Sequence, residues 1–168
     1  MNEIRYTKTK KRVLSIYPTY RGFGFTIFDG ANNLLDWGHS GVEKQDFEIL
    51  KKRVETLIEY YQPELIISQD IQPPDFDRSQ KTSQTIRDLK QICIKHRIHF
   101  QTISRSEIKN VFIQFDAYTK HQRATAIASF LPVLDNTLPS KRKPWQSEDL
   151  RMSIFDSASL ALTYFYSK

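Results

Sequence analysis

RVLSIYPTYRGFGFTIFD, residues 12–29, is the stretch that decides the fold. Its first half contains the compact aliphatic run Val13–Tyr17, which is stopped by Pro18. Gly22 and Gly24 then lead into FTIFD, residues 25–29, which has the alternating pattern of a strand. Because β-branched and aromatic residues favour strands while Pro and Gly mark turns, the stretch predicts a strand, a tight turn and a second strand. The other segments are expected to assemble around this hairpin.

After the hairpin, the strand pattern gives way to alternating helices and strands. The turn signal at residues 30–33 predicts a third strand over residues 34–42, in meander order. Asp46 can cap the helix that follows, and Pro63 ends it. The next expected elements are a strand at 65–68, a loop at 71–83, a helix that ends near Arg97 and a strand at 99–103.

Three further helices are expected in the last part of the chain. Ser104 and Thr119 each precede a Glu or Gln by three residues, the spacing of a capping box. Ser147 is expected to cap the last helix, with Glu148 and Asp149 favourably placed near its positive end.

The expected element order, β-β-β-α-β-α-β-α-α-α, predicts an α/β fold. Three strands in a meander, followed by strands that alternate with helices, give a mixed five-stranded sheet with helices on both faces. That is the arrangement of an RNase H-like domain. At 168 residues the chain is expected to form a basic N-terminal arm over residues 1–12 and a single domain over residues 13–168.

Composition narrows the classes of partner. The net charge of +6 favours a polyanion, with nucleic acid first, and the alternative is a basic surface kept for solubility. The single cysteine, Cys93, is expected to be a buried apolar residue, so a disulfide framework is excluded. No apolar run approaches the roughly 18 residues of a membrane span, and no apolar stretch typical of a secretory signal follows the N-terminus. A cytoplasmic protein without a membrane partner is the expectation.

Carboxylates from separate elements could converge at the strand ends of such a sheet. There they could hold two Mg²⁺ or Mn²⁺ ions, which would activate water and stabilise the leaving oxygen of a phosphodiester. Asp156 is the best candidate, because an ionised carboxylate is costly in the otherwise apolar helix SIFDSASLALTYF unless it is paired or metal-bound. The alternative is a structural, hydrogen-bonding acid. Ser153 and Asp149 lie one and two helical turns earlier, and Asp149 has the alternative role of a first-turn helix acid.

The strand at 65–68 ends in Gln69 and Asp70, whose side chains must point to opposite faces. One of them can therefore reach the shared site. Gln69 could ligate a metal weakly through its carbonyl oxygen, whereas Asp70 could be a metal ligand, together with Asp156, or an ordinary acid at the start of a loop. Tyr17, at the end of the first strand, carries no negative charge at neutral pH.

Basic residues fit a role in tracking phosphates. Lys141, Arg142 and Lys143 form a dense cluster, and Trp145 beside them adds a surface on which a base could stack. Arg21 in the first turn and Lys120 at a helix start could reach phosphates near the proposed site. The alternative for any of these residues is a solvated surface cation.

At this point the chain resembles the RuvC-like branch of the RNase H superfamily, which contains the Holliday junction resolvases. The resemblance covers most of residues 13–166 and rests on four motifs in the right order. These are Ile16–Gly24 as first strand and turn, Leu65–Asp70 as fourth strand, Thr119–Ala124 as a Lys-containing helix start, and Asp156–Leu162 as closing helix.

The chain departs from the family at its acidic positions. The resemblance implies an Asp on the first strand, a Glu at the end of strand four and an acid one turn before the final Asp. Tyr17, Gln69 and Ser153 stand at these positions, unless a shift of one residue brings Asp70 into the place of Gln69. Asp156 matches cleanly. Loss of these ligands should remove tight binding of Mg²⁺.

Three functions follow as hypotheses. The first is a catalytically impaired relative of the resolvases that binds branched or structured DNA, such as a four-way junction. The second is an active Mg²⁺-dependent endonuclease with a site rearranged around Asp70, Asp149 and Asp156. The third is a protein-interaction scaffold that does not bind DNA. The resemblance also implies a possible homodimer.

Overall fold

The computed structural model describes residues 11–41, 47–70 and 80–167. The expected cap at Asp46, residues 1–10 of the expected arm and residues 71–79 of the expected loop lie outside these ranges. Arg12, placed in the arm by the sequence, is the first residue of strand β1.

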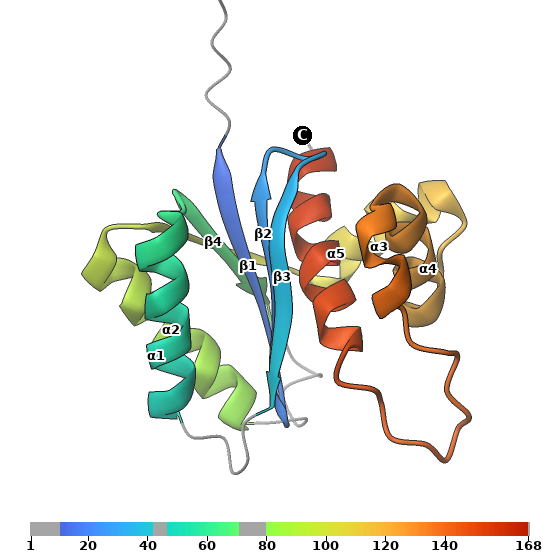
Figure 1. Ribbon diagram of the computed structural model, residues 1–168, viewed down its shortest axis with the longest axis horizontal. Coiled ribbons are helices and arrows are strands. Elements are labelled where there is room, and N and C mark those ends of the chain that lie inside the picture. Colours follow the sequence, from blue (N-terminus) through green and yellow to red (C-terminus); the bar gives the residue numbers. More distant parts are fainter. Residues whose placement is uncertain (1–10, 42–46, 71–79, 168) are drawn as a thin grey trace, which may run out of the picture.

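A mixed five-stranded sheet forms the centre of the molecule, as predicted (Figure 1). The strands are ordered β3-β2-β1-β4-β5. β2 pairs antiparallel with both β1 and β3, whereas β4 pairs parallel with both β1 and β5. The strand bounds are Arg12–Thr19 for β1, Gly22–Asp29 for β2, Leu34–Gly41 for β3, Leu65–Gln69 for β4 and His99–Ile103 for β5.

Helices cover both faces of this sheet, which confirms the predicted fold class. In Figure 1, α1 and α2 lie on one side of the strands, and α3, α4 and α5 lie on the other. The helices are α1 at Phe47–Tyr61, α2 at Gln80–His96, α3 at Arg105–Phe112, α4 at Lys120–Phe130 and α5 at Met152–Tyr166, with short 3₁₀ turns η3 at Ile113–Phe115 and η4 at Pro132–Thr137.

Alternation along β1 divides the core into two layers. Leu14 and Ile16 pack into a cluster with buried residues of α1 and α2. Val13 packs into the other cluster, which contains residues of α3, α4 and α5. Since successive side chains of a strand point to opposite faces, Ser15 and Tyr17 share the face that Val13 presents to α5. The end of β1 therefore brings Tyr17 to the side of the sheet that carries Asp156.

Buried hydroxyl groups join β1 and β2 to the middle of α5. Ser15 Oγ donates to the Ser157 carbonyl oxygen at 2.7 Å, and Ser157 Oγ donates to the Ser15 carbonyl oxygen at 2.8 Å. Thr26 Oγ1 lies 2.9 Å from Ser157 Oγ. Because these fully buried hydroxyls all have partners, they add specific contacts without leaving an unsatisfied polar group. They fix the position of α5 along the hairpin, and with it the position of the neighbouring Asp156.

Gly24 permits a close approach between the hairpin and the first turn of α5. A Cβ atom at Gly24 would lie 2.2 Å from both the carbonyl carbon and the carbonyl oxygen of Ser153, a distance that no side chain tolerates. Gly24 is also the residue that pairs with Tyr17 across β1 and β2. The glycine therefore lets the start of α5 lie directly beside the end of β1.

The two predicted capping boxes are confirmed. Ser104 and Thr119 each accept a hydrogen bond from the backbone three residues on, and Glu107 and Gln122 bind back to the cap residues. Both predictions succeeded because every partner lies within four consecutive residues.

The predicted start of the last helix at Ser147 is wrong. Helix α5 begins at Met152, with Arg151 in the cap position. Asp149 Oδ1 accepts a hydrogen bond from the backbone N–H of Arg151 at 2.9 Å, and the Asp149 carbonyl oxygen accepts from the N–H of Met152 at 3.0 Å. Asp149 therefore forms a local turn ahead of the helix, since a short acidic side chain readily binds its own backbone two residues on.

Two other boundaries also differ from the predictions. Helix α2 begins at Gln80, inside the loop expected over residues 71–83. Strand β1 continues through Pro18 to Thr19. The proline is tolerated because the pairing of β1 with β4 covers Val13–Ser15, so Pro18 lies beyond the part of the strand that is paired on both sides.

Candidate nucleic-acid interface and acidic site

Tyr17 lies at the end of β1, half-buried and packed against the core on the α5 side. Lys120 Nζ lies 5.7 Å from the centre of its ring, within the range of a cation–π interaction. Burial, together with the negative charge of Asp156, raises the pKa of the Tyr17 hydroxyl to about 12. The side chain is therefore neutral at physiological pH, and it brings an aromatic face to a position where the resemblance implies a carboxylate.

Lys120 is the first residue of α4, and its ammonium group joins two carboxylates. Nζ lies 2.9 Å from Asp156 Oδ2 and 2.5 Å from Glu148 Oε1. Burial by itself would lower the pKa of the amine, but the charges of Asp156 and Glu148 outweigh it and raise that pKa above its ordinary value. Lys120 is therefore a permanent cation at this site.

Asp156 lies on the first turns of α5 and is 8% exposed. Burial raises its pKa to about 6, although Lys120 acts in the opposite direction. Glu148 raises the pKa further, and Arg123 of α4 lowers it. The desolvation of this carboxylate is thus incompletely offset by its cationic neighbours. Sequence reasoning missed Arg123, which follows Lys120 by three residues and so shares its side of α4.

Gln69, rather than Asp70, has its side chain on the face of α5. Leu65 and Ile67 of β4 belong to the core on that face, and alternation puts Gln69 with them. Its Nε2 donates to the Pro18 carbonyl oxygen at 2.9 Å, so the side chain lies across the end of β1. Asp70 follows β4, and its backbone N–H donates to the Ile103 carbonyl oxygen.

Ser153 occupies the first turn of α5, against Gly24 of the hairpin. Its Oγ donates to the Leu150 carbonyl oxygen at 2.6 Å, which satisfies the hydroxyl locally. The three positions where the resemblance implies acids, at Tyr17, Gln69 and Ser153, thus all carry neutral side chains on the face of Asp156.

Asp149 forms a separate ion pair beside this site. Its Oδ2 lies 2.7 Å from Arg151 Nη2, and its Oδ1 accepts from Arg151 Nε at 3.1 Å. These hydrogen bonds from Arg151 lower the pKa of Asp149 to about 2. Asp149 and Asp156 line a pocket of about 210 Å³ together with Glu148, whereas Asp70 does not line it.

Glu148 is the residue whose role the sequence failed to indicate. It was expected to stabilise a helix start, but its carboxylate pairs with Lys120. Its backbone carbonyl oxygen also accepts a hydrogen bond from Arg21 Nη2 in the β1–β2 turn. Glu148 thereby ties the segment before α5 to both α4 and the hairpin.

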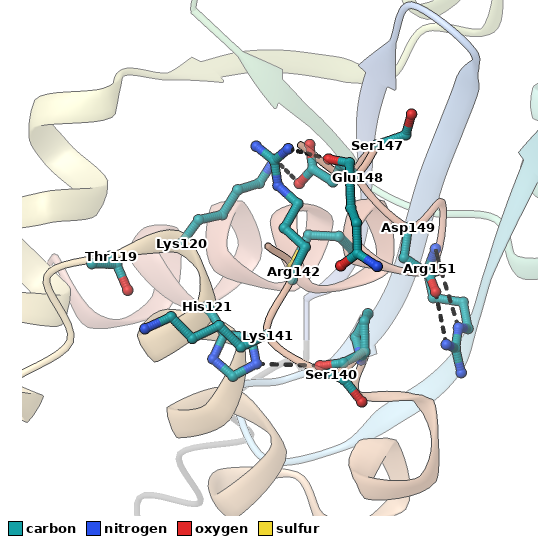
Figure 2. Close-up of a pocket in the computed structure, with 13 residues that line it drawn as sticks. Thr119, Lys120, His121, Ser140, Lys141, Arg142, Ser147, Glu148, Asp149 and Arg151 are labelled. Carbon is teal, nitrogen blue, oxygen red and sulfur yellow. Dashed lines mark hydrogen bonds and ion pairs between the residues drawn. The ribbon is translucent and has the colours of Figure 1, made fainter. Parts of the chain in front are cut away.

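A second pocket, of about 560 Å³, shares Glu148 and Asp149 with the first (Figure 2). Lys120 and His121 line it from the start of α4, and Lys141 and Arg142 line it from the loop before α5. His121 Nε2 lies 3.2 Å from the Pro139 carbonyl oxygen, a contact that holds this loop against α4. Three of the predicted basic residues therefore converge on one depression.

Lys143 and Trp145 lie in a tight turn of the same loop. The Gln146 side chain accepts from the backbone N–H of Lys143 at 2.9 Å, and Arg142 Nη1 donates to the Gln146 carbonyl oxygen at 2.7 Å. Trp145 is 78% exposed, and Lys143 Nζ lies 5.4 Å from its ring centre. The turn thus presents a large aromatic surface to solvent beside this pocket, which both basic and acidic side chains line.

The residues present do not fit a two-metal site. Across residues 11–41, 47–70 and 80–167, no three His, Cys, Asp or Glu side chains form a group that could hold a metal ion. Asp156 and Glu148 share the Lys120 ammonium, and Asp149 is paired with Arg151. Asp70 and Asp156 therefore remain predicted metal ligands, and the described residues do not gather around them into a group that could hold a metal ion.

None of the described helices is long and apolar enough to cross a membrane.

No model of a known protein family matches the chain, and no curated protein matches it significantly. Several solved structures, however, are similar to the chain. Thermus thermophilus RuvC in complex with Holliday junction substrate superposes with a TM-score of 0.68 at 15% identity, over 94% of both chains. The yeast mitochondrial Holliday junction resolvase Ydc2 gives 0.59 at 14% identity, over 93% of this chain and 79% of the resolvase. The Fowlpox virus resolvase, in complex with Holliday junction DNA, gives 0.51 at 17% identity, over 93% and 99%.

These likenesses extend over nearly the whole chain and agree with the strand order and the two helical layers described above. At such low identity, they are evidence for the fold. The chain has an RNase H-like fold of the RuvC type.

Proposed function

We propose that this protein binds branched or structured DNA, such as a four-way junction, and that it does not cut it. The observation that carries the proposal is the gathering of Lys120, Lys141 and Arg142 around one pocket, between the start of α4 and the loop before α5. Structures with this fold include resolvases in complex with Holliday junction DNA. The net charge of +6 would add a general attraction for a polyanion.

Within this proposal, Lys141 and Arg142 contact backbone phosphates, and Arg21 contacts a strand that passes the β1–β2 turn. Lys141 and Arg142 are well suited because both are exposed and line the pocket from the same loop. Phosphate contacts position a protein on nucleic acid without reading sequence, so the expected selectivity is for DNA structure. Trp145 would stack on an exposed base beside them.

The loss of catalysis is proposed from the chemistry of the acidic site. Tyr17, Gln69 and Ser153 are neutral, and Asp156 is engaged by Lys120. Hydrolysis of a phosphodiester by two metal ions needs several anionic ligands to hold the ions. Such a protein would occupy a junction and leave its strands intact.

The direct test measures affinity for a labelled four-way junction over a salt series, with and without Mg²⁺ or Mn²⁺. Replacing Lys141 and Arg142 by Ala should weaken binding and lower the slope of log affinity against log salt by about 1 for each lost phosphate contact. Lys90→Ala is the matched control, because Lys90 is exposed on α2, across the sheet. Equal effects of the loop variants and of Lys90→Ala would contradict the assignment of the interface.

Trp145 is tested separately with Trp145→Ala and Trp145→Phe. If Trp145 stacks on a base, the alanine variant should lose on the order of 1–3 kcal/mol of junction affinity, while phenylalanine retains most of it. Linear duplex, in which bases are already stacked, should be affected less. An identical loss on junction and duplex would assign Trp145 to general packing of the loop.

An active endonuclease is the second candidate, and one observation favours it. Asp149, Asp156 and Glu148 line a common pocket, so the chain has acids close together even though they are paired. Metal-dependent cleavage that Asp156→Asn abolishes, and that Asp70→Asn weakens, would establish this function. If the protein has no affinity for DNA at low salt, the protein-interaction scaffold would be favoured instead. The predicted homodimer is a separate question, which analytical ultracentrifugation would test.

A further inference from the structure

The ammonium group of Lys120 lies between two carboxylates that belong to different segments. Asp156 Oδ2 is 2.9 Å from Nζ on the α5 side, and Glu148 Oε1 is 2.5 Å from it on the side of the preceding loop. Both carboxylates therefore face the same point, where a cation can meet an oxygen of each. The position of Nζ is therefore that of a cation in a carboxylate site.

Several contacts hold the ammonium there. The ring of Tyr17 lies 5.7 Å from Nζ, and side chains of Asp156 and Glu148 are 11% and 38% exposed. Lys120 also begins a helix whose cap at Thr119 is closed by a full capping box, which fixes the origin of its side chain. The lysine is thus anchored at both its backbone and its charged end.

We propose that Lys120 is the resident cation of this site and that it closes the Asp156 and Glu148 carboxylates to Mg²⁺ and Mn²⁺. A divalent ion would have to displace an ammonium group that is tethered to the chain, and would then lie beside the displaced charge. Mg²⁺ also gives up its water reluctantly, and Asp156, Glu148 and Asp149, the acids that line the pocket in the described part of the chain, are all paired with cations. This inference concerns the same site as the proposed function, but its test contains no DNA, so the two can fail independently.

Mn²⁺ titration monitored by electron paramagnetic resonance, which counts the free ion, is the experiment. The wild-type protein should leave Mn²⁺ free, whereas Lys120→Gln should bind one equivalent at least about tenfold more tightly than wild type, through Asp156 and Glu148. Lys120→Arg keeps the positive charge and should behave as wild type. The double variant Lys120→Gln, Asp156→Asn should lose the binding that Lys120→Gln gains.

Two results would overturn the proposal. One is binding of Mn²⁺ by the wild-type protein that Asp156→Asn removes, since the lysine would then not exclude the metal. The other is a folded Lys120→Gln variant that binds Mn²⁺ no better than wild type. The first measurement requires no change at Lys120, so the proposal stays falsifiable even if Lys120→Gln does not fold.

Discussion

Two ion pairs lie beside the same pocket, and their carboxylates respond to pairing in opposite ways. Asp156, which is buried and paired with Lys120, has a pKa raised to about 6. Asp149, which is 40% exposed and paired with Arg151, has a pKa lowered to about 2. Both acids have a cation within 2.9 Å. The difference shows that the net shift of a carboxyl pKa depends on whether the charge of its partner outweighs the loss of water around the acid.

The largest effect should come from removing the cation of the buried pair. Lys120→Met leaves Asp156 buried without its closest countercharge, and should destabilise the protein by on the order of 3 kcal/mol at pH 7.5. The destabilisation should shrink below pH 6, where Asp156 can take up a proton. Urea denaturation at pH 7.5 and pH 5 measures both quantities. Lys90→Met is the control, and a Lys120→Met effect no larger than that of the control would remove the distinction between the two pairs.

A smaller effect should appear in the pH dependence of the wild-type protein. Because the folded-state pKa of Asp156, about 6, lies above its ordinary value of 3.8, the folded state holds the proton more tightly than the unfolded state. The stability this contributes is fully present below pH 3.8 and is lost as the pH rises through 6, with a total on the order of 3 kcal/mol. Asp156→Asn should abolish this part of the profile. A difference profile between the two proteins that is flat from pH 4 to pH 7 would contradict the assigned shift.

The smallest effect is expected at the exposed pair, with the opposite sign. The pKa of Asp149 is lowered, so its contribution is present above pH 3.8 and is lost as the pH falls toward 2. Solvent screens this pair, and Asp149→Asn should leave the melting temperature at neutral pH close to that of wild type. Thermal unfolding of Asp149→Asn at pH 3 and pH 7 provides the check. A large loss at pH 7 would mean that the turn formed by Asp149 organises the start of α5.

The two pairs also explain what the sequence could predict and what it could not. The capping boxes at Ser104 and Thr119 depend on adjacent residues, and they were predicted correctly. The prediction that Glu148 and Asp149 stabilise the start of the last helix was wrong, because the partners that these acids bind in the folded chain determine their role. Glu148 binds Lys120, which is distant in the sequence, and Asp149 binds the backbone of Arg151. Local pattern therefore indicated a helix start where the folded chain forms ion pairs.

The sequence names candidate site residues, which stay a prediction, but it could not say how they are arranged. Alternation allowed either Gln69 or Asp70 to face the last helix, and the choice required knowing which face of β4 is covered by α5. The neutral character of Tyr17 could be read directly, whereas the approach of Lys120 to its ring depends on the packing of α4. A sequence thus shows which residues stand at the ends of the strands. It does not show that the ammonium group of Lys120 lies beside them.

The hydroxyl contacts between Ser15, Thr26 and Ser157 have a consequence for biosynthesis. They join the first hairpin to the last helix, across 142 residues in the case of Ser15 and Ser157. A ribosome releases the hairpin before α5, so the surface that receives α5 lacks its partner until that helix emerges. Contacts at such sequence separation form late and slow folding. The nascent chain must therefore leave the part of the hairpin that receives α5 without this cover while the residues between Ser15 and Ser157 are synthesised.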